Sequence, residues 1–407
     1  MIRQDLENKT ATVYVAMSGG VDSSVAAALL KKEDYNVIGV FMRPWSPNPK
    51  GRTLKGSQGS TFSDRNFCLW KKDREDALRA ASVLGIPLLT WDFSKEYKKE
   101  VGDYMIREYR AGRTPNPDVM CNKEIKFGLF LKRALREGAD FIATGHYVRL
   151  KSRRGPVSAH PHRTHYHSVR RGSPSRATPL IYELHTARDK NKDQSYFLWT
   201  LKQEQLKHCL FPIGNYTKPE VRKMAKKFGL SNHDKKDSQG VCFIGPLDMK
   251  EFLKKYIKPK PGKIILHGHL VKLQDAHVIG RHDGVYYYTI GQRHGLDIKN
   301  GQGPYYVVGK DVKKNIIYVG KEKDLRGKEA RISNISWINK PKLPVQVSVR
   351  IRYRSRPEKA TLFRSSTSKH QFILRFKKPI RAITSGQSAV FYRKIEMLGG
   401  GIINQEV

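Results

Sequence analysis

Residues 18–24 read SGGVDSS, and an apolar stretch lies on either side of them. The preceding residues 12–17 have the composition of a buried parallel strand, and residues 22–32 have that of a helix. Gly19 and Gly20 allow a tight turn and a close approach of the backbone, which a larger side chain would block. The start of a helix presents unpaired N–H groups and a partial positive charge. We therefore predict that this strand, turn and helix form a phosphate-binding loop.

The loop is not a Walker A motif, which needs the pattern GxxxxGK[ST] and a lysine on the terminal phosphates. A bare SGG would fit an ordinary turn between a strand and a helix. The complete heptad in this context favours phosphate binding.

The first half of the chain alternates between strand and helix patterns. This rhythm predicts an α/β fold with a parallel sheet flanked by helices, in which ligands bind at the carboxyl ends of the strands. The phosphate-binding loop, Met42 and Gly145 all fall at such ends. Further strands are expected over residues 36–42, 87–91 and 140–144, and helices over residues 71–84, 95–110 and 124–137.

The sequence pattern changes in the later part of the chain. Helices are expected over residues 218–228 and 247–256, and short alternating runs after residues 259–262 predict a small antiparallel β-barrel. These runs cover residues 285–290, 305–308, 316–319, 345–353, 371–376 and 389–392. We therefore expect a parallel-sheet domain over residues 1–201, a mostly helical central domain over residues 202–258 and a β-barrel domain over residues 259–407. Inside the first domain, residues 43–67 are expected to form a mobile loop and residues 151–179 a basic insertion.

The composition points to a polyanionic partner. The 407 residues include 77 Lys and Arg against 37 Asp and Glu, a formal net charge of +40. Such a surplus is larger than solubility requires and is typical of proteins that bind nucleic acid. No apolar run is long enough to span a membrane. The first ten residues resemble neither a signal peptide nor a transit peptide, which fits a cytosolic protein or a processed organellar one.

The four cysteines stand at positions 68, 121, 209 and 242, without a CxxC pair. A structural zinc site therefore has little support, and no metal site is expected. His160, His162, His165 and His167 in the insertion are better explained by a flexible basic tract, since no Cys or carboxylate joins them.

One cysteine lies in the block GRTPNPDVMCNKEIKF at residues 112–127. We expect its two prolines to stiffen a loop ahead of the helix that starts at position 124. Asp118 and Cys121 would then lie near the amino end of that helix. The helix terminus and Lys123 favour the reactive thiolate, and a carboxylate three residues away can take or hold a proton.

A second cysteine lies in the block DSQGVCFIG at residues 237–245. Here Cys242 sits between glycines in a polar stretch, which suits a thiol that moves. Cys68 and Cys209 lack such surroundings, and we interpret them as small apolar side chains.

Apolar residues alternate with arginines over residues 345–356. The two-residue period of a strand predicts that Arg350, Arg352, Arg354 and Arg356 share one face, about 6.6–6.8 Å apart. Such a row would follow a phosphate backbone, and a solvated outer face is the alternative.

The loop at residues 18–24 resembles the PP-loop of ATP pyrophosphatases. Together with the two cysteine blocks, the chain also contains TGHY at residues 144–147, NKDQSYFL at 191–198, YTIGQRHGL at 288–296 and RAITSGQSAVFY at 381–392. In this order and over nearly the whole chain, the blocks resemble the tRNA-specific 2-thiouridylases. GRHDG at residues 280–284, DSQG and the high positive charge are most similar to mitochondrial members, which implies a location in the mitochondrial matrix.

The resemblance implies a PP-loop catalytic domain and a reaction. ATP, with Mg²⁺, would adenylylate oxygen 2 of the wobble uridine of a tRNA, in the family those for Lys, Glu and Gln. A sulfur-donor protein of a cysteine desulfurase relay would load Cys242 as a persulfide, which attacks carbon 2, and Cys121, near the catalytic Asp118, would then resolve the disulfide or release the sulfur. The implied ATP contacts are Ala16, Met17, Ser18, Gly19, Gly20, Val21, Asp22, Ser23, Met42 and Gly145. The implied tRNA contacts are Asn116, Pro117, Asp118, His146, Lys192, Asp193, Gln194, Arg352, Tyr353 and Gln387.

Three alternatives stay open. An amidotransferase-type PP-loop synthetase would lack a use for the two motif cysteines. A tRNA-binding protein without activity would have no use for the PP-loop beside them. An iron–sulfur version would use Cys121, Cys242 and Asp118 as ligands, although three ligands without local Cys spacing make it the weaker interpretation.

Overall fold

The fold was analysed in a computed structural model of the chain. It describes residues 10–45, 69–154, 179–237, 240, 242, 248–268, 277–366, 368 and 371–404. Most of the expected loop at residues 43–67, Cys68 and residues 155–178 of the expected insertion, with its four histidines, lie outside the described residues.

A five-stranded parallel sheet forms the first layer, as predicted. Its strand order is β3-β2-β1-β4-β7. The strands are β1 (Thr12–Ala16), β2 (Asn36–Arg43), β3 (Leu88–Asp92), β4 (Phe141–Thr144) and β7 (Cys209–Leu210). The central strand β1 is apolar along its length and is paired on both sides, with β2 and β4. The carboxyl ends of these three strands therefore lie side by side, where the phosphate-binding loop begins.

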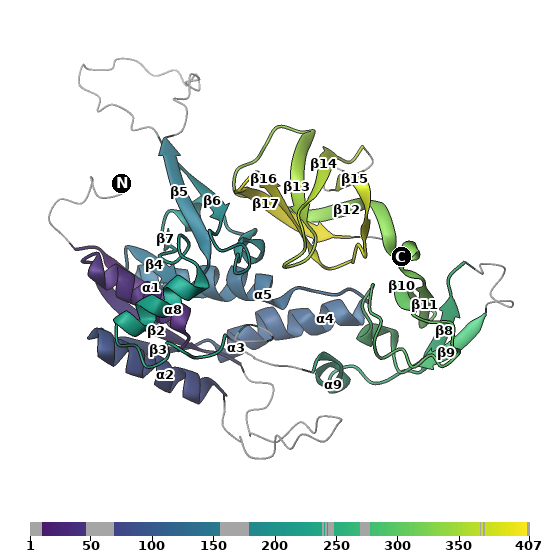
Figure 1. The fold of residues 1–407 in the computed structure, drawn as a ribbon, viewed down its shortest axis with the longest axis horizontal. Coiled ribbons are helices and arrows are strands. Elements are labelled where there is room, and N and C mark those ends of the chain that lie inside the picture. The colour runs from purple at the N-terminus through teal and green to yellow at the C-terminus, as the bar shows by residue number, and fades with distance from the viewer. Residues whose placement is uncertain are drawn as a thin grey trace, which may run out of the picture.

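Helices cover both faces of this sheet. One face packs against α1 (Val21–Lys32), α2 (Leu69–Leu84) and α8 (Lys218–Lys227), whose apolar side chains join one core with β1 and β2 (Figure 1). The other face packs against two long helical stretches. The first is continuous through α3 (Ser94–Tyr97), the π-helical η1 (Lys98–Asp103) and α4 (Tyr104–Arg110), and the second through α5 (Pro117–Met120), the π-helical η2 (Cys121–Phe130) and α6 (Leu131–Arg136).

The second helical stretch begins earlier than predicted. We expected a loop up to position 124, but the helix starts at Pro117. Proline fits the first position of a helix because its φ angle is already helical and its missing N–H is not needed there. The Asn116 side chain caps this end by accepting from the Val119 N–H at 3.3 Å. Asp118 and Cys121 therefore lie inside the first turns of the helix.

The C-terminal strands form a closed six-stranded antiparallel barrel, which confirms the predicted barrel. Its order is β12-β15-β14-β13-β16-β17, and β12 also pairs with β17. The strands are β12 (Arg326–Trp337), β13 (Val345–Arg350), β14 (Glu358–Arg364), β15 (Phe372–Arg381), β16 (Ser388–Arg393) and β17 (Glu396–Ile403). An antiparallel hairpin from the first half, β5 (Val148–Arg154) and β6 (Leu180–Thr186), extends this sheet because β6 pairs with β17.

A smaller sheet lies beside the barrel, at the end of the molecule opposite the parallel sheet (Figure 1). It contains β8 (Gly262–Leu266), β9 (Val278–His282), β10 (Tyr306–Asp311) and β11 (Ile316–Gly320), in the order β10-β11-β8-β9, with α9 (Met249–Lys254) packed against it. The described residues between 259 and 404 therefore form two sheets and not one barrel. The short 3₁₀ helix η4 (Val285–Tyr287) replaces the strand expected at residues 285–290.

The central range also divides differently from our expectation. Strand β7 belongs to the parallel sheet, and α8 packs on α1, so the first unit extends past residue 201. The remaining short helices are α7 (Gln203–Leu206), the 3₁₀ helix η3 (Ser195–Leu198) and the 3₁₀ helix η5 (Glu322–Leu325). Within the described residues, no helix has the length and apolar character that crossing a membrane requires.

Candidate active site

The predicted phosphate-binding loop joins β1 to α1. Gly19 has φ +73°, and a Cβ atom there would lie 2.1 Å from the carbonyl oxygen of Asp73 in α2. Only glycine fits this position. The Ser23 hydroxyl accepts from the Ser18 N–H at 3.2 Å and donates to the Gly20 carbonyl at 3.1 Å. The loop is thus folded back on the start of α1.

Both other predicted ATP contacts lie at the same edge of the sheet. Gly145 follows β4, and a Cβ atom there would lie 2.6 Å from the Ser23 backbone nitrogen. Met42 is buried near the end of β2, with 4% of its surface exposed. The structure therefore brings the segments after β1, β2 and β4 together at one place.

A buried lysine lies beside this loop, and sequence reasoning missed it. Lys218, the first residue of α8, is only 7% exposed. Its ammonium group lies 2.7 Å from an Asp22 carboxylate oxygen and 2.6 Å from an Asp237 carboxylate oxygen. The Tyr147 hydroxyl donates to Asp22 at 2.8 Å. A buried cation therefore lies beside the loop, although the loop motif itself contains no lysine or arginine.

The two motif cysteines meet although 121 residues separate them. The Cys121 and Cys242 sulfur atoms are 3.4 Å apart, with Cys121 buried in η2 and Cys242 half-buried. An Asp118 carboxylate oxygen accepts from the Cys242 N–H at 2.8 Å. The Tyr97 hydroxyl donates to the Cys242 carbonyl at 2.6 Å. The three residues expected to act in catalysis therefore converge, and Tyr97 is a further contact that the sequence did not indicate.

The charges around the cysteines favour a thiolate at Cys242. The hydrogen bond from Cys121 and the nearby Lys126 ammonium outweigh burial and lower the pKa of Cys242 to about 7. Burial and the neighbouring Cys242 raise the pKa of Cys121 well above its ordinary value. Burial also raises the pKa of Asp118, although the hydrogen bond from the Cys242 N–H and the charge of Lys126 act to lower it. One sulfur is thus prepared to attack, while the other keeps its proton.

The cation beside the sulfurs is Lys126 and not Lys123. Lys123 is exposed and pairs with Glu124 at 2.7 Å. Burial disfavours the charged form of Lys126, but the two sulfurs and Asp118 outweigh it and raise the pKa of this lysine. The wide turns of a π-helix bring residues five positions apart onto one side, and Lys126 stands five positions after Cys121. The sequence offered no signal for this departure from α-helical spacing.

Four of the predicted tRNA contacts lie on the helices and loops that pack against the parallel sheet. His146 is buried against the Phe127 ring at 5.8 Å and meets the Thr144 hydroxyl at 2.8 Å. Burial and Lys126 lower the pKa of His146 well below its ordinary value, so the ring is neutral near pH 7. Gln194 accepts from the Tyr147 N–H at 3.0 Å. Asn116 and Pro117 form the start of α5, as described above.

Other predicted tRNA contacts lie at the junction with the barrel. Asp193 is 3% exposed and pairs with Arg350 at 2.5 Å. Gln387 donates to the Thr114 carbonyl at 2.9 Å. The Gln387 bond ties the barrel to the segment that carries Cys121, and the Arg350 pair engages the Asp193 carboxylate inside the protein.

The predicted row of four arginines is wrong. Strand β13 ends at Arg350, and Arg354 has φ +60°, so the two-residue alternation does not continue. Arg352 turns inward and donates to the Ile290 carbonyl at 3.0 Å and to the Thr384 hydroxyl at 2.6 Å. The aromatic ring of Tyr353 lies 4.3 Å from that of Phe197.

Lys192 also belongs to the charged group near the loop, because it pairs with Asp237.

Cys209 is buried in the core, as expected for a small apolar side chain. In the described part of the chain, no group of three or more His, Cys, Asp and Glu residues is arranged to hold a metal ion.

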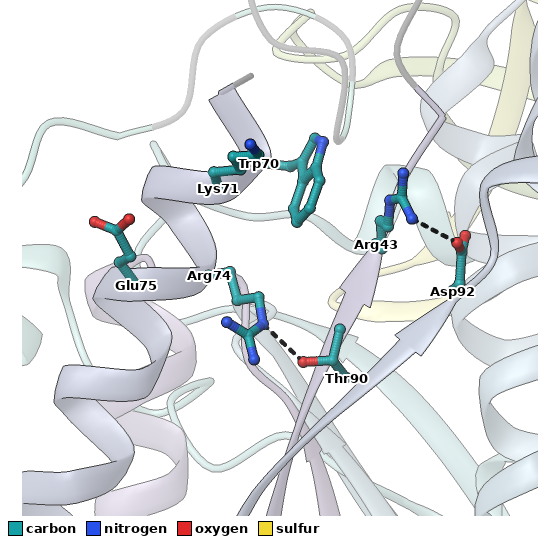
Figure 2. A pocket seen from close by; sticks show the side chains of 7 residues that line it. All are labelled: Arg43, Trp70, Lys71, Arg74, Glu75, Thr90 and Asp92. Atoms are coloured by element: carbon teal, nitrogen blue, oxygen red, sulfur yellow. Dashed lines mark hydrogen bonds and ion pairs between the residues drawn. The ribbon is translucent and has the colours of Figure 1, made fainter. Parts of the chain in front are cut away.

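A separate cavity of about 380 Å³ lies at the carboxyl ends of β2 and β3 (Figure 2). Arg43 lies 4.8 Å from the centre of the Trp70 ring and pairs with Asp92 at 2.9 Å, and Arg74 donates to the Thr90 hydroxyl at 2.9 Å. None of the residues predicted for ATP, catalysis or tRNA lines this cavity.

Models of known protein families match this chain in three consecutive ranges. Residues 11–246 match the family model described as the tRNA methyl transferase HUP domain, and residues 250–321 that of the tRNA methyl transferase PRC-barrel domain. Residues 327–403 match the model described as the aminomethyltransferase beta-barrel domain. These three ranges correspond to the parallel sheet with its helices, the small sheet and the closed barrel.

Curated relatives carry a more specific name. The chain is 42% identical to tRNA-specific 2-thiouridylase MnmA 2 of Geobacillus kaustophilus, over 97% of this chain and 94% of that protein. It is 41% identical to MnmA of Bacillus licheniformis, over 96% and 94%, and 42% identical to MnmA of Lacticaseibacillus paracasei, over 98% and 96%. With identity of this level over almost the full length, the chain belongs to the tRNA-specific 2-thiouridylase family.

Proposed function

We propose that this protein is an ATP-dependent tRNA-uridine 2-sulfurtransferase that converts a wobble uridine to 2-thiouridine. The observation that carries the proposal is the 3.4 Å approach of Cys121 and Cys242, with Asp118 bonded to the Cys242 backbone. Family membership over nearly the whole length supports it.

The proposed chemistry starts with activation of the base. Uridine oxygen 2 attacks the α-phosphorus of ATP, and pyrophosphate leaves. The folded loop from Ser18 to Asp22 and the amino end of α1 would hold the phosphates, and Mg²⁺ would neutralise part of their charge. The carbonyl oxygen thereby becomes part of a good leaving group, AMP.

Sulfur transfer follows at the two cysteines. The terminal sulfur of a Cys242 persulfide forms a bond to carbon 2, and AMP departs with the original oxygen. The Cys121 thiol then attacks the Cys242 sulfur and gives up its proton to the nucleotide, so the bond between the two persulfide sulfurs breaks and its electron pair stays on the nucleotide as 2-thiouridine. A Cys121–Cys242 disulfide remains, and the 3.4 Å separation leaves little movement for its formation.

The net charge and the family membership also support the proposed partners. The net charge of +40 suits a tRNA, and the uridine must leave the anticodon stack to reach both cysteines. We further propose the wobble uridines of tRNAs for Lys, Glu and Gln as substrates, a cysteine desulfurase relay as sulfur donor and the mitochondrial matrix as location. The last of these rests on the sequence pattern alone, since the relatives compared above are bacterial.

The decisive experiment is nucleoside mass spectrometry of tRNA from cells with and without this protein, with mitochondrial and cytosolic tRNA analysed separately. Loss of 2-thiouridine from the mitochondrial fraction alone is expected. In the purified reaction, tRNA-dependent ADP in place of AMP and pyrophosphate would contradict the PP-loop assignment. Iron and acid-labile sulfide in anaerobically purified active enzyme would instead favour a cluster on Cys121, Cys242 and Asp118.

A further inference from the structure

The Gly19 carbonyl of the phosphate-binding loop is held by a segment that lies far away in the sequence. The Asn232 side-chain amide donates to this oxygen at 3.1 Å, and the Lys235 ammonium group donates to it at 3.2 Å. Asn232 stands 213 residues after Gly19, in the turns that follow α8. Two side chains from outside the loop therefore converge on one of its backbone oxygens.

The Asn232 amide is buried, with 5% of the residue exposed, and it also donates to the Ser24 hydroxyl at 3.0 Å. Because the Gly19 carbonyl can only accept, the NH₂ group of the amide must face the loop. The amide oxygen on the other side is buried and has no hydrogen-bond partner among the described residues. Burial of an unpaired acceptor is unfavourable, so the two bonds to the loop are what this amide contributes here.

The Lys235 ammonium group is fixed between the loop and helix α2. It pairs with the carboxylates of Asp73 at 2.8 Å and Asp76 at 2.7 Å, both in α2. Burial acts to lower the pKa of Lys235, but the hydrogen bonds to these two carboxylates outweigh it and raise this pKa. Lys235 is therefore a cation with a fixed position when it donates to the Gly19 carbonyl.

A fixed Gly19 carbonyl also fixes the direction of the next backbone N–H. The Gly19 C=O and the Gly20 N–H belong to one planar trans peptide, in which they point in opposite directions. The two donors therefore aim the Gly20 N–H away from Asn232 and Lys235. In the described part of the chain, no group accepts a hydrogen bond from this N–H. It is thus a backbone donor with a set direction that is free to bind an anion.

We propose that Asn232 and Lys235 are positioning residues of the ATP site, which aim the Gly20 N–H at a phosphate group of the nucleotide through their bonds to the Gly19 carbonyl. This inference rests on the proposed binding of ATP at the loop. The next peptide needs no such support, because the Gly20 carbonyl accepts from the nearby Ser23 hydroxyl at 3.1 Å. The segment after α8 therefore belongs to the ATP site, although it contains no residue of the loop motif.

The test compares the unaltered full chain with Asn232→Leu, which nearly preserves the side-chain volume and the charge but removes both donors. Binding is measured for α,β-methylene ATP with Mg²⁺ by calorimetry, and for adenosine, which has no phosphate, by ligand-observed NMR. Asn232→Leu should weaken binding of the nucleotide at least about fivefold and of adenosine less than about twofold, because only the phosphates lose an oriented donor. A purely structural role would change both affinities alike.

Asn215→Leu is the matched control, since it makes the same change at an exposed side chain that bonds to no other described residue. It should bind both ligands like the unaltered protein. Lys235→Met should repeat the selective loss when compared with Lys236→Met, in which the lysine is exposed and has no ion pair with a described residue. This second pair of variants decides the question if Asn232→Leu does not fold.

Unchanged nucleotide affinity in a folded Asn232→Leu protein, or equal losses for the nucleotide and adenosine, would overturn the proposed positioning role. Absence of nucleotide binding to the unaltered protein would instead refute the proposed ATP site.

Discussion

Lys126→Met is the change that most directly tests how the site prepares its nucleophile. Methionine keeps most of the volume of the lysine side chain but removes its charge. The Lys126 ammonium group lowers the pKa of Cys242, and it does so together with the hydrogen bond from Cys121. We therefore expect the pKa of Cys242 to rise in this variant.

The expected rise in the pKa of Cys242 can be worked out from the lost interaction with Lys126. With a pKa of about 7, close to half of Cys242 is thiolate at pH 7. A hydrogen bond to a charged group contributes about 1.5 kcal/mol, which corresponds to roughly a tenfold change in an ionisation equilibrium. Losing it should slow alkylation of Cys242 several-fold at pH 7. The difference in alkylation rate between the variant and the unaltered protein should vanish above about pH 9, where the thiol ionises in both proteins.

The assay is the pH dependence of iodoacetamide labelling at Cys242, read by peptide mass spectrometry between pH 5.5 and about 10. Lys123→Met is the matched control, since it removes the same charge from an exposed lysine that pairs with Glu124. Its profile should match that of the unaltered protein. An unshifted profile in Lys126→Met, with the protein folded, would refute the assignment of this lysine.

Asp22→Asn should reduce AMP and pyrophosphate formation by at least about a hundredfold while tRNA affinity, measured by filter binding, changes less than about twofold, because Asp22 belongs to the phosphate-binding loop and pairs there with Lys218. Cys242→Ser should abolish both the persulfide label from a radiolabelled donor and all 2-thiouridine, whereas Cys121→Ser should accept the label and stall; a label on Cys121 with an active Cys242→Ser would reverse the roles. Asp193→Ala should lower the free energy of unfolding by about 3–5 kcal/mol, seen in urea titration, because it leaves Arg350 without its buried partner; a change below about 1 kcal/mol would contradict this view of the junction.

Local patterns were sufficient to predict the parallel sheet, the phosphate loop and the barrel. The loop heptad combines glycines, a strand and a helix within a short stretch, and each requirement is visible in the residues themselves. The two cysteines could be paired only through resemblance to a family, because no spacing rule brings Cys121 close to Cys242. Their 3.4 Å approach depends on the helix packing and on the bonds from Asp118 and Tyr97.

The errors arose where tertiary contacts override a local pattern. The alternation after position 345 predicted a long strand, but Arg350 and Arg352 turn toward partners in other elements. Lys126 and Lys218 went unnoticed because nothing distinguishes them among 77 Lys and Arg residues. Their importance comes from burial next to sulfur or carboxylate, and this is a property of the folded chain alone.

The pairing of β6 with β17 has a consequence for how the protein is made. Strand β6 comes from the first half of the chain, whereas β17 is the last strand described. On the ribosome, the outer edge of β6 emerges long before its partner, and its N–H and C=O groups remain open to other strands meanwhile. Completion of this sheet joins residues far apart in sequence, which makes it a slow, late step of folding. A nascent chain that stalls before its final strand would therefore expose an unpaired strand edge, to which other chains can add.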